Sequence, residues 1–315
     1  MSEVFGRSGI LLIDKPAGIT SHDVGARTRK RAGTRKVGHA GTLDPMATGL
    51  LMLGINNSTR LLTYLVGLDK EYLATIRLGS ATTTDDAQGE PIGVADPALV
   101  DALTEVTVSA ALMPLTGAIS QVPSSVSAIR VDGKRAYTLV REGETVELAP
   151  RSVTVSALEV LQSRREAGFY DLDVRVRCSS GTYIRAIARD LGAVLGVGGH
   201  LTALRRSMIG PFSVADAVEL ESLDVAAALL SPAAIATVLF PVFVLDSEQA
   251  VHLGHGKRLV VERPDGPPGP VAAIAPDGRL VGLLAFADGI GKPIVNFAPD
   301  VPTEPLAPKT PVANE

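Results

Sequence analysis

The sequence predicts an α+β protein in which one sheet domain is followed by a small β-barrel. Strand-like and helix-like segments are mixed without the regular strand–helix–strand period of a doubly wound fold. After Pro241 the pattern changes to short apolar runs separated by Gly- and Pro-rich turns, which is typical of short strands. A chain of 315 residues is long enough for two domains.

The N-terminal elements follow from local signals. Residues 10–13 are an apolar run that predicts a short buried strand, ended by a Pro–Ala–Gly turn. Thr20 or Ser21 has the side chain of a helix N-cap, and the helix after it is expected to end near Gly33. Residues 37–48 predict a Gly-rich loop.

The next segments predict the middle of the sheet domain. Residues 50–55 are apolar and strand-like, and residues 72–78 alternate so that Tyr72 shares a face with the apolar positions. Residues 82–90 have the polar composition of a turn. Residues 99–112 predict an amphipathic helix.

The clearest strand is the segment 171–178. Its apolar residues occupy alternate positions that end at Cys178, and its charged residues occupy the others. Cys178 is therefore expected in the core rather than as a reactive thiol. A turn then leads into a helix from about Tyr183 to Leu195, which Gly196 stops.

Composition indicates a cytoplasmic protein. The chain is 46% hydrophobic, its first ten residues lack a signal peptide, and its single cysteine fits a reducing compartment. The uncharged segment 225–245 has the length of a membrane span, but Pro232 and Pro241 interrupt it. Packed core elements are the better interpretation, and no membrane association is expected.

Charge is unevenly spread along the chain. The net charge is −4, yet residues 1–79 hold 11 Lys and Arg against 6 Asp and Glu. Six of these cations lie in ten positions with no acid between them: Arg27, Arg29, Lys30, Arg31, Arg35 and Lys36. Such a run is usually a solvated face, but it also suits contact with nucleic-acid phosphates.

The strongest functional signal is Gly38-His39-Ala40-Gly41-Thr42-Leu43-Asp44-Pro45-Met46-Ala47-Thr48-Gly49. Taken locally, an Asp before Pro is a turn former, and the glycines fit neither a dinucleotide fingerprint nor a phosphate-binding loop. The whole segment, however, resembles the catalytic loop of the TruB family of pseudouridine synthases. Three other stretches agree in the same order: Asp14-Lys15-Pro16-Ala17-Gly18-Ile19-Thr20-Ser21, Lys70-Glu71-Tyr72, and Cys178-Ser179-Ser180-Gly181-Thr182-Tyr183-Ile184-Arg185.

The resemblance covers roughly residues 8 to 215 and implies a domain plan. It implies a mixed, mostly antiparallel sheet flanked by helices in a catalytic domain over 8–240, with a PUA-like RNA-binding domain over 241–300. Residues 121–151 resemble an RNA-clamping insertion, although Val126 and Arg130 depart from its commoner pattern. Proline spacing in 301–315 predicts a disordered, extended tail.

The resemblance also implies the reaction, in which uridine-55 in the T-loop of tRNA becomes pseudouridine. That reaction breaks the N1–C1′ bond and rejoins the base through C5, so it needs no cofactor. Asp44 would be the nucleophile, and its target, C1′ or C6, stays open. Arg185 would keep the buried carboxylate ionised, and Tyr72 would stack on the base and is a candidate to remove the C5 proton.

Other residues receive roles from the same resemblance. Tyr183 and Leu204 would line the uracil pocket, His39 would hold open the RNA that the base has left, and Lys15 would meet phosphates. The base must leave its stack first, at a cost of about a few kcal/mol. His252 and His255 have a metal-like gap, but no further ligand lies at a suitable spacing, so no metal is assigned.

Two alternatives stay open, and two more are weak. The protein could remodel tRNA without catalysis, or both activities could coexist. It could also need a guide RNA like the related dyskerin type, although its clamp suits stand-alone recognition by a monomer, with the C-terminal domain on the acceptor stem. With 4% aromatic residues and no Trp an RRM-like binder is disfavoured. A glycosidase would need a second paired carboxylate in a motif.

Overall fold

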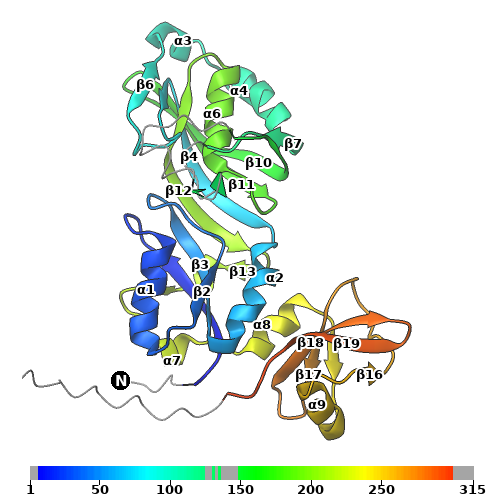
Figure 1. Cartoon of the computed structure of the whole chain (residues 1–315). Coiled ribbons are helices and arrows are strands. Elements are labelled where there is room, and N and C mark those ends of the chain that lie inside the picture. Colours follow the sequence, from blue (N-terminus) through cyan, green and yellow to red (C-terminus); the bar gives the residue numbers. More distant parts are fainter. Residues whose placement is uncertain (1–5, 125–129, 132–133, 136–147, 301–315) are drawn as a thin grey trace, which may run out of the picture.

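The computed structural model describes residues 6–124, 130–131, 134–135 and 148–300 (Figure 1). Within these ranges the main sheet has ten strands, in the order β14-β1-β3-β12-β4-β11-β10-β7, with β2 and β13 paired to β3 and β12. The strands are β1 (Gly9–Lys15), β2 (Val37–Ala40), β3 (Thr48–Ile55), β4 (Lys70–Leu78), β7 (Gly117–Gln121), β10 (Arg151–Glu166), β11 (Phe169–Cys178), β12 (Gly199–Ile209), β13 (Phe212–Ser213) and β14 (Val218–Glu219). Two pairs, β1 with β14 and β3 with β12, are parallel, which confirms a mixed, mostly antiparallel sheet.

Helices cover the sheet in two groups, one at each end of the long β12 strand (Figure 1). The group around β1 to β3 comprises α1 (Ser21–Ala32), η1 (Asn56–Leu61), α2 (Leu62–Val66), η3 (Val214–Asp216), α7 (Val225–Ala228) and α8 (Pro232–Leu239). The group around β4, β10 and β11 comprises α3 (Pro97–Asp101), α4 (Glu105–Leu112), η2 (Met113–Leu115) and α6 (Ile184–Val194). Short strand pairs lie outside the main sheet: β5 (Ser80–Thr82) with β6 (Pro91–Val94), and β8 (Arg130–Val131) with β9 (Lys134–Arg135).

The C-terminal part forms a second, five-stranded sheet in the order β15-β17-β18-β19-β16. Its elements are β15 (Val242–Val244), α9 (Ser247–Gly254), β16 (Leu259–Val260), β17 (Val271–Ile274), β18 (Leu280–Ala287) and β19 (Ile290–Asn296). This half-barrel agrees with the expected small PUA-like domain. Its residues Leu280 and Phe297 share one apolar core with Ile10 and Ile235 of the main domain, so the two parts pack together.

Helix α1 forms where the sequence predicts it, because both of its ends carry a specific signal. Thr20 is the N-cap, and its hydroxyl accepts from the Asp23 amide while the Asp23 carboxylate accepts from the Thr20 amide. Gly33 ends the helix with φ of 65°, a conformation that glycine adopts without strain.

Two sequence expectations are wrong in detail. The first part of the predicted 37–48 loop is strand β2, because residues 37–40 pair with β3 in regular antiparallel register. The predicted single helix over 99–112 is two helices, α3 and α4. Thr104 separates them, since its side chain and that of Thr107 form a capping box that starts α4 anew.

The long apolar segment near residue 235 is divided into α7, α8 and β15. No helix in the described part of the chain is both long and apolar enough to cross a membrane. Much of the clamp insertion expected at 121–151, and all of the tail predicted at 301–315, lie outside the described residues.

Gly49 is a position where the approach of β3 to β12 requires a residue without a side chain. Its φ is +101°, and a Cβ atom there would lie 2.2 Å from the Arg206 carbonyl oxygen on β12. Gly49→Ala is therefore expected to lower the thermal unfolding midpoint by at least about 4 °C. Gly67→Ala is the matched control, because its φ is −74° and nothing lies within 4 Å. Equal midpoints for the two variants would contradict this account.

Candidate active site

The loop 41–47, which joins β2 to β3, is tied to the N-terminal segment at two points. The Ser21 hydroxyl accepts from the Leu43 amide at 2.9 Å and donates to the Leu43 carbonyl at 3.2 Å. The Gly18 amide donates to the Pro45 carbonyl at 2.8 Å. These contacts lie on either side of residue 44, so they fix the backbone that presents its carboxylate.

Lys15 gives the loop a third anchor from inside the protein. Its side chain has 0% exposure, and its amine donates to the carbonyls of Pro16, Ile19 and Pro45 at 2.9, 2.7 and 3.3 Å. Burial lowers the pKa of Lys15 to about 8. The expectation that Lys15 meets phosphates is not met in this conformation, because its amine holds the loop instead.

Asp44 and Arg185 meet as the sequence analysis expected. The Arg185 Nε donates to the Asp44 Oδ2 at 2.9 Å, which joins the loop to the first turn of α6. The arginine side chain is 4% exposed and the aspartate side chain 36%. The guanidinium is thus buried and holds a carboxylate that still faces the solvent-accessible cleft.

Arg185 has a second acidic partner that the sequence analysis missed. Its NH1 group donates to the Thr84 carbonyl at 2.7 Å and lies 3.5 Å from the Asp86 Oδ2. The Asp86 carboxylate is itself held by the Thr84 hydroxyl at 2.6 Å and the Gln88 amide at 3.0 Å. Residues 82–90 predict only a turn, so no sequence signal distinguished Asp86 from an ordinary turn former.

Tyr72 and Leu204 approach the cleft from neighbouring strands. Tyr72 on β4 pairs in register with Arg206 on β12, and Leu204 lies two residues before Arg206 on the same face. Tyr72 and Leu204 are 9% and 7% exposed. Burial raises the pKa of the Tyr72 phenol, and the positive charge of Arg206 acts in the opposite direction.

Tyr183 lies at the N-terminus of α6, two residues before Arg185. Its amide donates to the Gln121 Oε1 at 2.9 Å, and the Gln121 Nε2 donates to its carbonyl at 3.1 Å. Gln121 is 2% exposed and belongs to β7. This pair of hydrogen bonds positions the start of the helix, and sequence reasoning had used Gln121 only as the beginning of the clamp motif.

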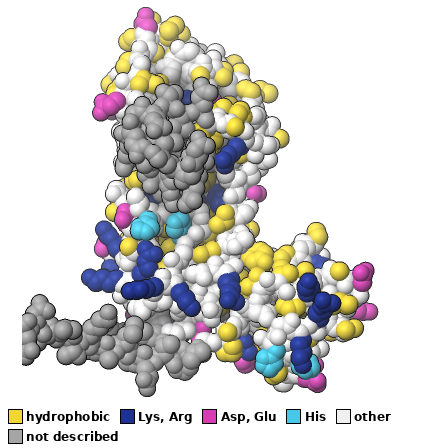
Figure 2. All heavy atoms as spheres, viewed as in Figure 1, with side chains coloured by type: hydrophobic (Ala, Val, Ile, Leu, Met, Phe, Trp, Pro, Cys, Tyr) yellow, Lys and Arg dark blue, Asp and Glu magenta, His cyan; other side chains and the backbone are white. Residues whose placement is uncertain are grey.

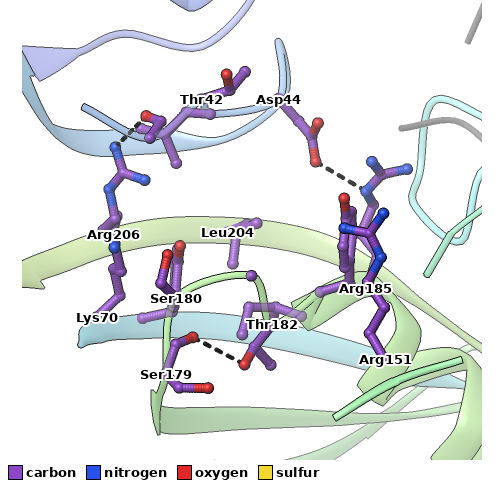
Figure 3. A pocket seen from close by; sticks show the side chains of 16 residues that line it. Thr42, Asp44, Lys70, Arg151, Ser179, Ser180, Thr182, Arg185, Leu204 and Arg206 are labelled. Atoms are coloured by element: carbon purple, nitrogen blue, oxygen red, sulfur yellow. Dashed lines mark hydrogen bonds and ion pairs between the residues drawn. The ribbon is translucent and has the colours of Figure 1, made fainter. Parts of the chain in front are cut away.

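One cleft of about 400 Å³ gathers most of the predicted residues. Asp44, Tyr72, Tyr183, Arg185 and Leu204 all line it. In Figure 3, Asp44 and Arg185 lie at one end of the cleft, while Arg206 and Lys70 lie at the other with Leu204 between.

Two groups of histidines lie elsewhere. His39 is half-buried on β2, opposite Leu53 of β3, and is not among the residues that line the cleft. His252 and His255 lie at the end of α9 in the C-terminal domain. Neither His252 nor His255 lines the cleft that contains Asp44 and Arg185.

Family models together match residues 29–298. "TruB family pseudouridylate synthase (N terminal domain)" matches residues 29–184. "tRNA pseudouridylate synthase B C-terminal domain" matches 185–251, and "tRNA Pseudouridine synthase II, C terminal" matches 240–298. The boundary near residue 184 falls next to Arg185, so the paired acid and arginine come from different matched segments.

Similar proteins and structures agree with these matches. The chain is 60% identical to "tRNA pseudouridine synthase B" of Leifsonia xyli, covering 93% of this chain and 97% of that protein. It is 53% identical to the protein of the same name from an Arthrobacter species, again over 93% and 97%. Among solved structures, a Cbf5-Nop10-Gar1 complex aligns with a TM-score of 0.63 at 25% identity, covering 90% of this chain and 78% of that one.

The Arg185 guanidinium should stabilise the fold by compensating buried acid. Arg185→Met would leave Asp86, whose side chain is 6% exposed, without its cation. The expected loss is about 3 kcal/mol in the free energy of unfolding, measured in urea. Arg175→Met is the control, because the ion pair of Arg175 with Glu159 is exposed and contributes about 0–1 kcal/mol. Equal losses would show that Arg185 has no special structural role.

Lys15 should give stability a measurable pH dependence. Between its folded pKa of about 8 and its ordinary value of 10.5, the unfolded chain binds more protons than the folded one. The free energy of unfolding therefore gains a contribution that rises with pH in this window. Lys15→Met should reduce that rise, with Lys30→Met as a control for loss of one charge. A wild-type slope in Lys15→Met would contradict the assignment.

Proposed function

This chain belongs to the TruB family of pseudouridine synthases, and on that premise we propose how its cleft acts on RNA. It is a tRNA pseudouridine synthase, an isomerase that converts uridine to pseudouridine. The target we assign is uridine-55 in the T-loop. The observation that carries the proposal is the contact between Asp44 and the buried Arg185 in the one cleft that also holds Tyr72.

The isomerisation requires a carboxylate nucleophile and a pocket that holds the uracil base. The N1–C1′ bond breaks, the base turns, and a C5–C1′ bond forms while C5 loses a proton and N1 gains one. Atoms and electrons balance within the nucleotide, so no oxidant, reductant or group donor is consumed, and we assign no cofactor. Asp44 supplies the nucleophile, to either C1′ or C6 of the target.

Asp44 is well prepared for that role. Its Oδ2 bonds to Arg185, which leaves the other carboxylate oxygen for the nucleotide. Arg185 in turn lies between Asp44 and Asp86, at 2.9 and 3.5 Å. Because its planar group is fixed on both sides, the arginine orients the nucleophile instead of moving with it.

The remaining cleft residues would hold the extruded base. We assign Tyr72 to one face of the uracil, with Leu204 and Tyr183 as further walls, and Tyr72 is the candidate to accept the C5 proton. His39 is assigned to the RNA from which the base has left. Its half-buried place on β2, the strand before the catalytic loop, supports a contact with RNA outside the base pocket.

The RNA backbone would meet the cationic surface on α1. Lys and Arg side chains gather over this part of the main domain in Figure 2. Arg27 is paired with Glu221, and Arg31 donates to carbonyls at Leu220 and Glu221, whereas Lys30 is exposed in the same helix. Counterions released when these cations contact phosphates would favour the binding of tRNA, although the net charge of the protein is negative.

The domain plan supports recognition of tRNA by one chain. We assign catalysis to 8–240 and a PUA-like RNA-binding domain, which would contact the acceptor stem, to 241–300. The start of the second sheet with β15 at Val242 supports the proposed boundary. Because one chain supplies every residue assigned to the cleft, we propose a monomer that works in the cytoplasm without a guide RNA.

A tRNA-remodelling protein without catalysis is the second candidate. It would use the cationic surface and the C-terminal domain but would have no use for a buried arginine that holds two acids beside an open cleft. The two activities can coexist, because an enzyme that opens and releases tRNA can assist its folding.

Asp44→Asn separates these candidates. The variant should lose pseudouridine formation by more than about 10⁴-fold, since the amide is not a nucleophile. Binding of tRNA should change by less than about threefold. Pseudouridine is measured at single-nucleotide resolution in an unmodified tRNA transcript with no guide RNA. Asp216→Asn, at an exposed position outside the cleft, is the control.

Three outcomes would contradict parts of the proposal. Retained activity in Asp44→Asn would show that Asp44 is not the nucleophile. Loss of tRNA binding alone would favour a structural role for Asp44. Wild-type protein that leaves the guide-free transcript unmodified would end the stand-alone assignment.

A further inference from the structure

Two buried cations line the cleft at the end away from Asp44. Lys70 on β4 is 6% exposed and Arg206 on β12 is 1% exposed, and both contribute to the cleft wall. Lys70 lies two residues before Tyr72 on the same strand, and Arg206 is the register partner of Tyr72 on the next strand. Figure 3 shows the two cations side by side, with Asp44 and Arg185 at the opposite end.

The hydrogen bonds of Lys70 and Arg206 go to backbone carbonyls, which accept from their N–H groups but do not neutralise their positive charges. Arg206 donates from Nε to the Leu50 carbonyl at 2.7 Å and from NH2 to the Gly41 carbonyl at 3.1 Å. The Lys70 amine donates to the carbonyls of Val66 and Leu68, each at 2.5 Å. Among the described residues, neither cation forms a hydrogen bond or ion pair with a carboxylate, so two positive charges are buried together without a directly bonded acid.

Two buried positive charges this close repel each other, and a bound anion would offset that electrostatic repulsion. Burial, followed by repulsion from Arg206, lowers the pKa of Lys70 to about 8, while Asp69 exerts a weaker attraction. The lysine is still mainly protonated near pH 7. Buried charge is normally paired, so a cleft that keeps two cations at one end is suited to a group that becomes negative there.

We propose that Lys70 and Arg206 form an anion-stabilising subsite for the carbonyl oxygens of the target uracil, which take up negative charge during the isomerisation. The inference rests on the proposed function and extends it to two residues to which neither the sequence motifs nor the assignment of the nucleophile gave a role. Arg206 is the register partner of Tyr72 and both residues line the cleft, so a base stacked on Tyr72 would present an edge to this end of the cleft.

The charge develops by either route open to Asp44. If the carboxylate attacks C1′, a C1′–O bond forms and the N1–C1′ electron pair leaves with the base, which becomes a uracil anion with charge on its carbonyl oxygens. If the carboxylate attacks C6, a C6–O bond forms and the C5–C6 electron pair moves toward the C4 carbonyl oxygen. Fixed cations beside those oxygens stabilise both intermediates more than the neutral uridine.

An RNA phosphate offers the same anionic chemistry from another source. A phosphate is charged before and after the reaction, so cations that bind it strengthen the ground state and the transition state alike. Loss of such cations would weaken tRNA binding and reduce its salt dependence. Loss of cations that serve the base would instead lower the rate of the bound complex.

The test uses Lys70→Met and Arg206→Gln, with Lys70→Arg and Arg206→Lys as variants that retain charge. Single-turnover pseudouridine formation is measured in an unmodified tRNA transcript at saturating protein. The neutral variants should lose about 10²- to 10³-fold in rate, and tRNA affinity should change by less than about threefold. Each variant that retains the charge should react at least about tenfold faster than the neutral variant at the same position. Arg175→Gln, on the opposite face of the sheet, is the matched control.

A second substrate separates electrostatic loss from misfolding. Fluorine at C5 stabilises negative charge on the base, so 5-fluorouridine at the target should need the cations less. The defect of each neutral variant, measured as consumption of 5-fluorouridine, should be at least about threefold smaller than with uridine. A variant that is only misfolded would show equal defects with both substrates.

Three results would overturn the inference. These are neutral variants with rates within about threefold of wild type, a loss confined to tRNA affinity as for a phosphate site, and equal defects with uridine and 5-fluorouridine. An inactive wild-type protein would instead refute the proposed function itself, a result that is distinct from any loss confined to the variants.

Discussion

The contact between Asp44 and Arg185 is the constraint on which the rest of the site depends. The two residues are 141 positions apart in the sequence, and one lies on a loop while the other lies on a helix. A carboxylate beside an apolar base needs a fixed cation to stay charged and oriented. The loop is therefore anchored by Lys15, Gly18 and Ser21, and the helix start is anchored by Gln121.

This arrangement explains why motifs that are distant in the sequence occur together. The N-terminal motif supplies anchors for the catalytic loop, among them the completely buried Lys15. The β4 and β12 strands then set the opposite wall, because their register aligns Tyr72 with Arg206. The cleft is consequently polarised, with an acid held by arginine at one end and two cations at the other.

Local sequence signals predicted a helix correctly where its capping residues are recognisable. They predicted poorly the features that depend on strand pairing or on weak capping signals. The cap at Thr20 and the glycine at Gly33 defined α1 correctly. Strand β2 was missed because its pairing with β3 is not visible in four residues of its own sequence. The break between α3 and α4 was missed because a Thr–Thr capping box is a weak signal.

The same division holds for the site. Asp44 and Arg185 were paired in advance through the resemblance of their motifs, not through any local pattern. Asp86 escaped notice because a turn explains it equally well. Lys70 and Arg206 could have been found, since positions two apart on a strand share a face, and each lies two residues from a predicted pocket residue, Tyr72 or Leu204.

The most direct test is the structure of this protein bound to a tRNA T-arm that carries 5-fluorouridine at the target. The account predicts that the base has left its stack and lies in the cleft, with a carboxylate oxygen of Asp44 bonded to, or in contact with, C1′ or C6 of the nucleotide. A base still stacked in the RNA, or a nucleotide whose nearest carboxylate belongs to another residue, would contradict it.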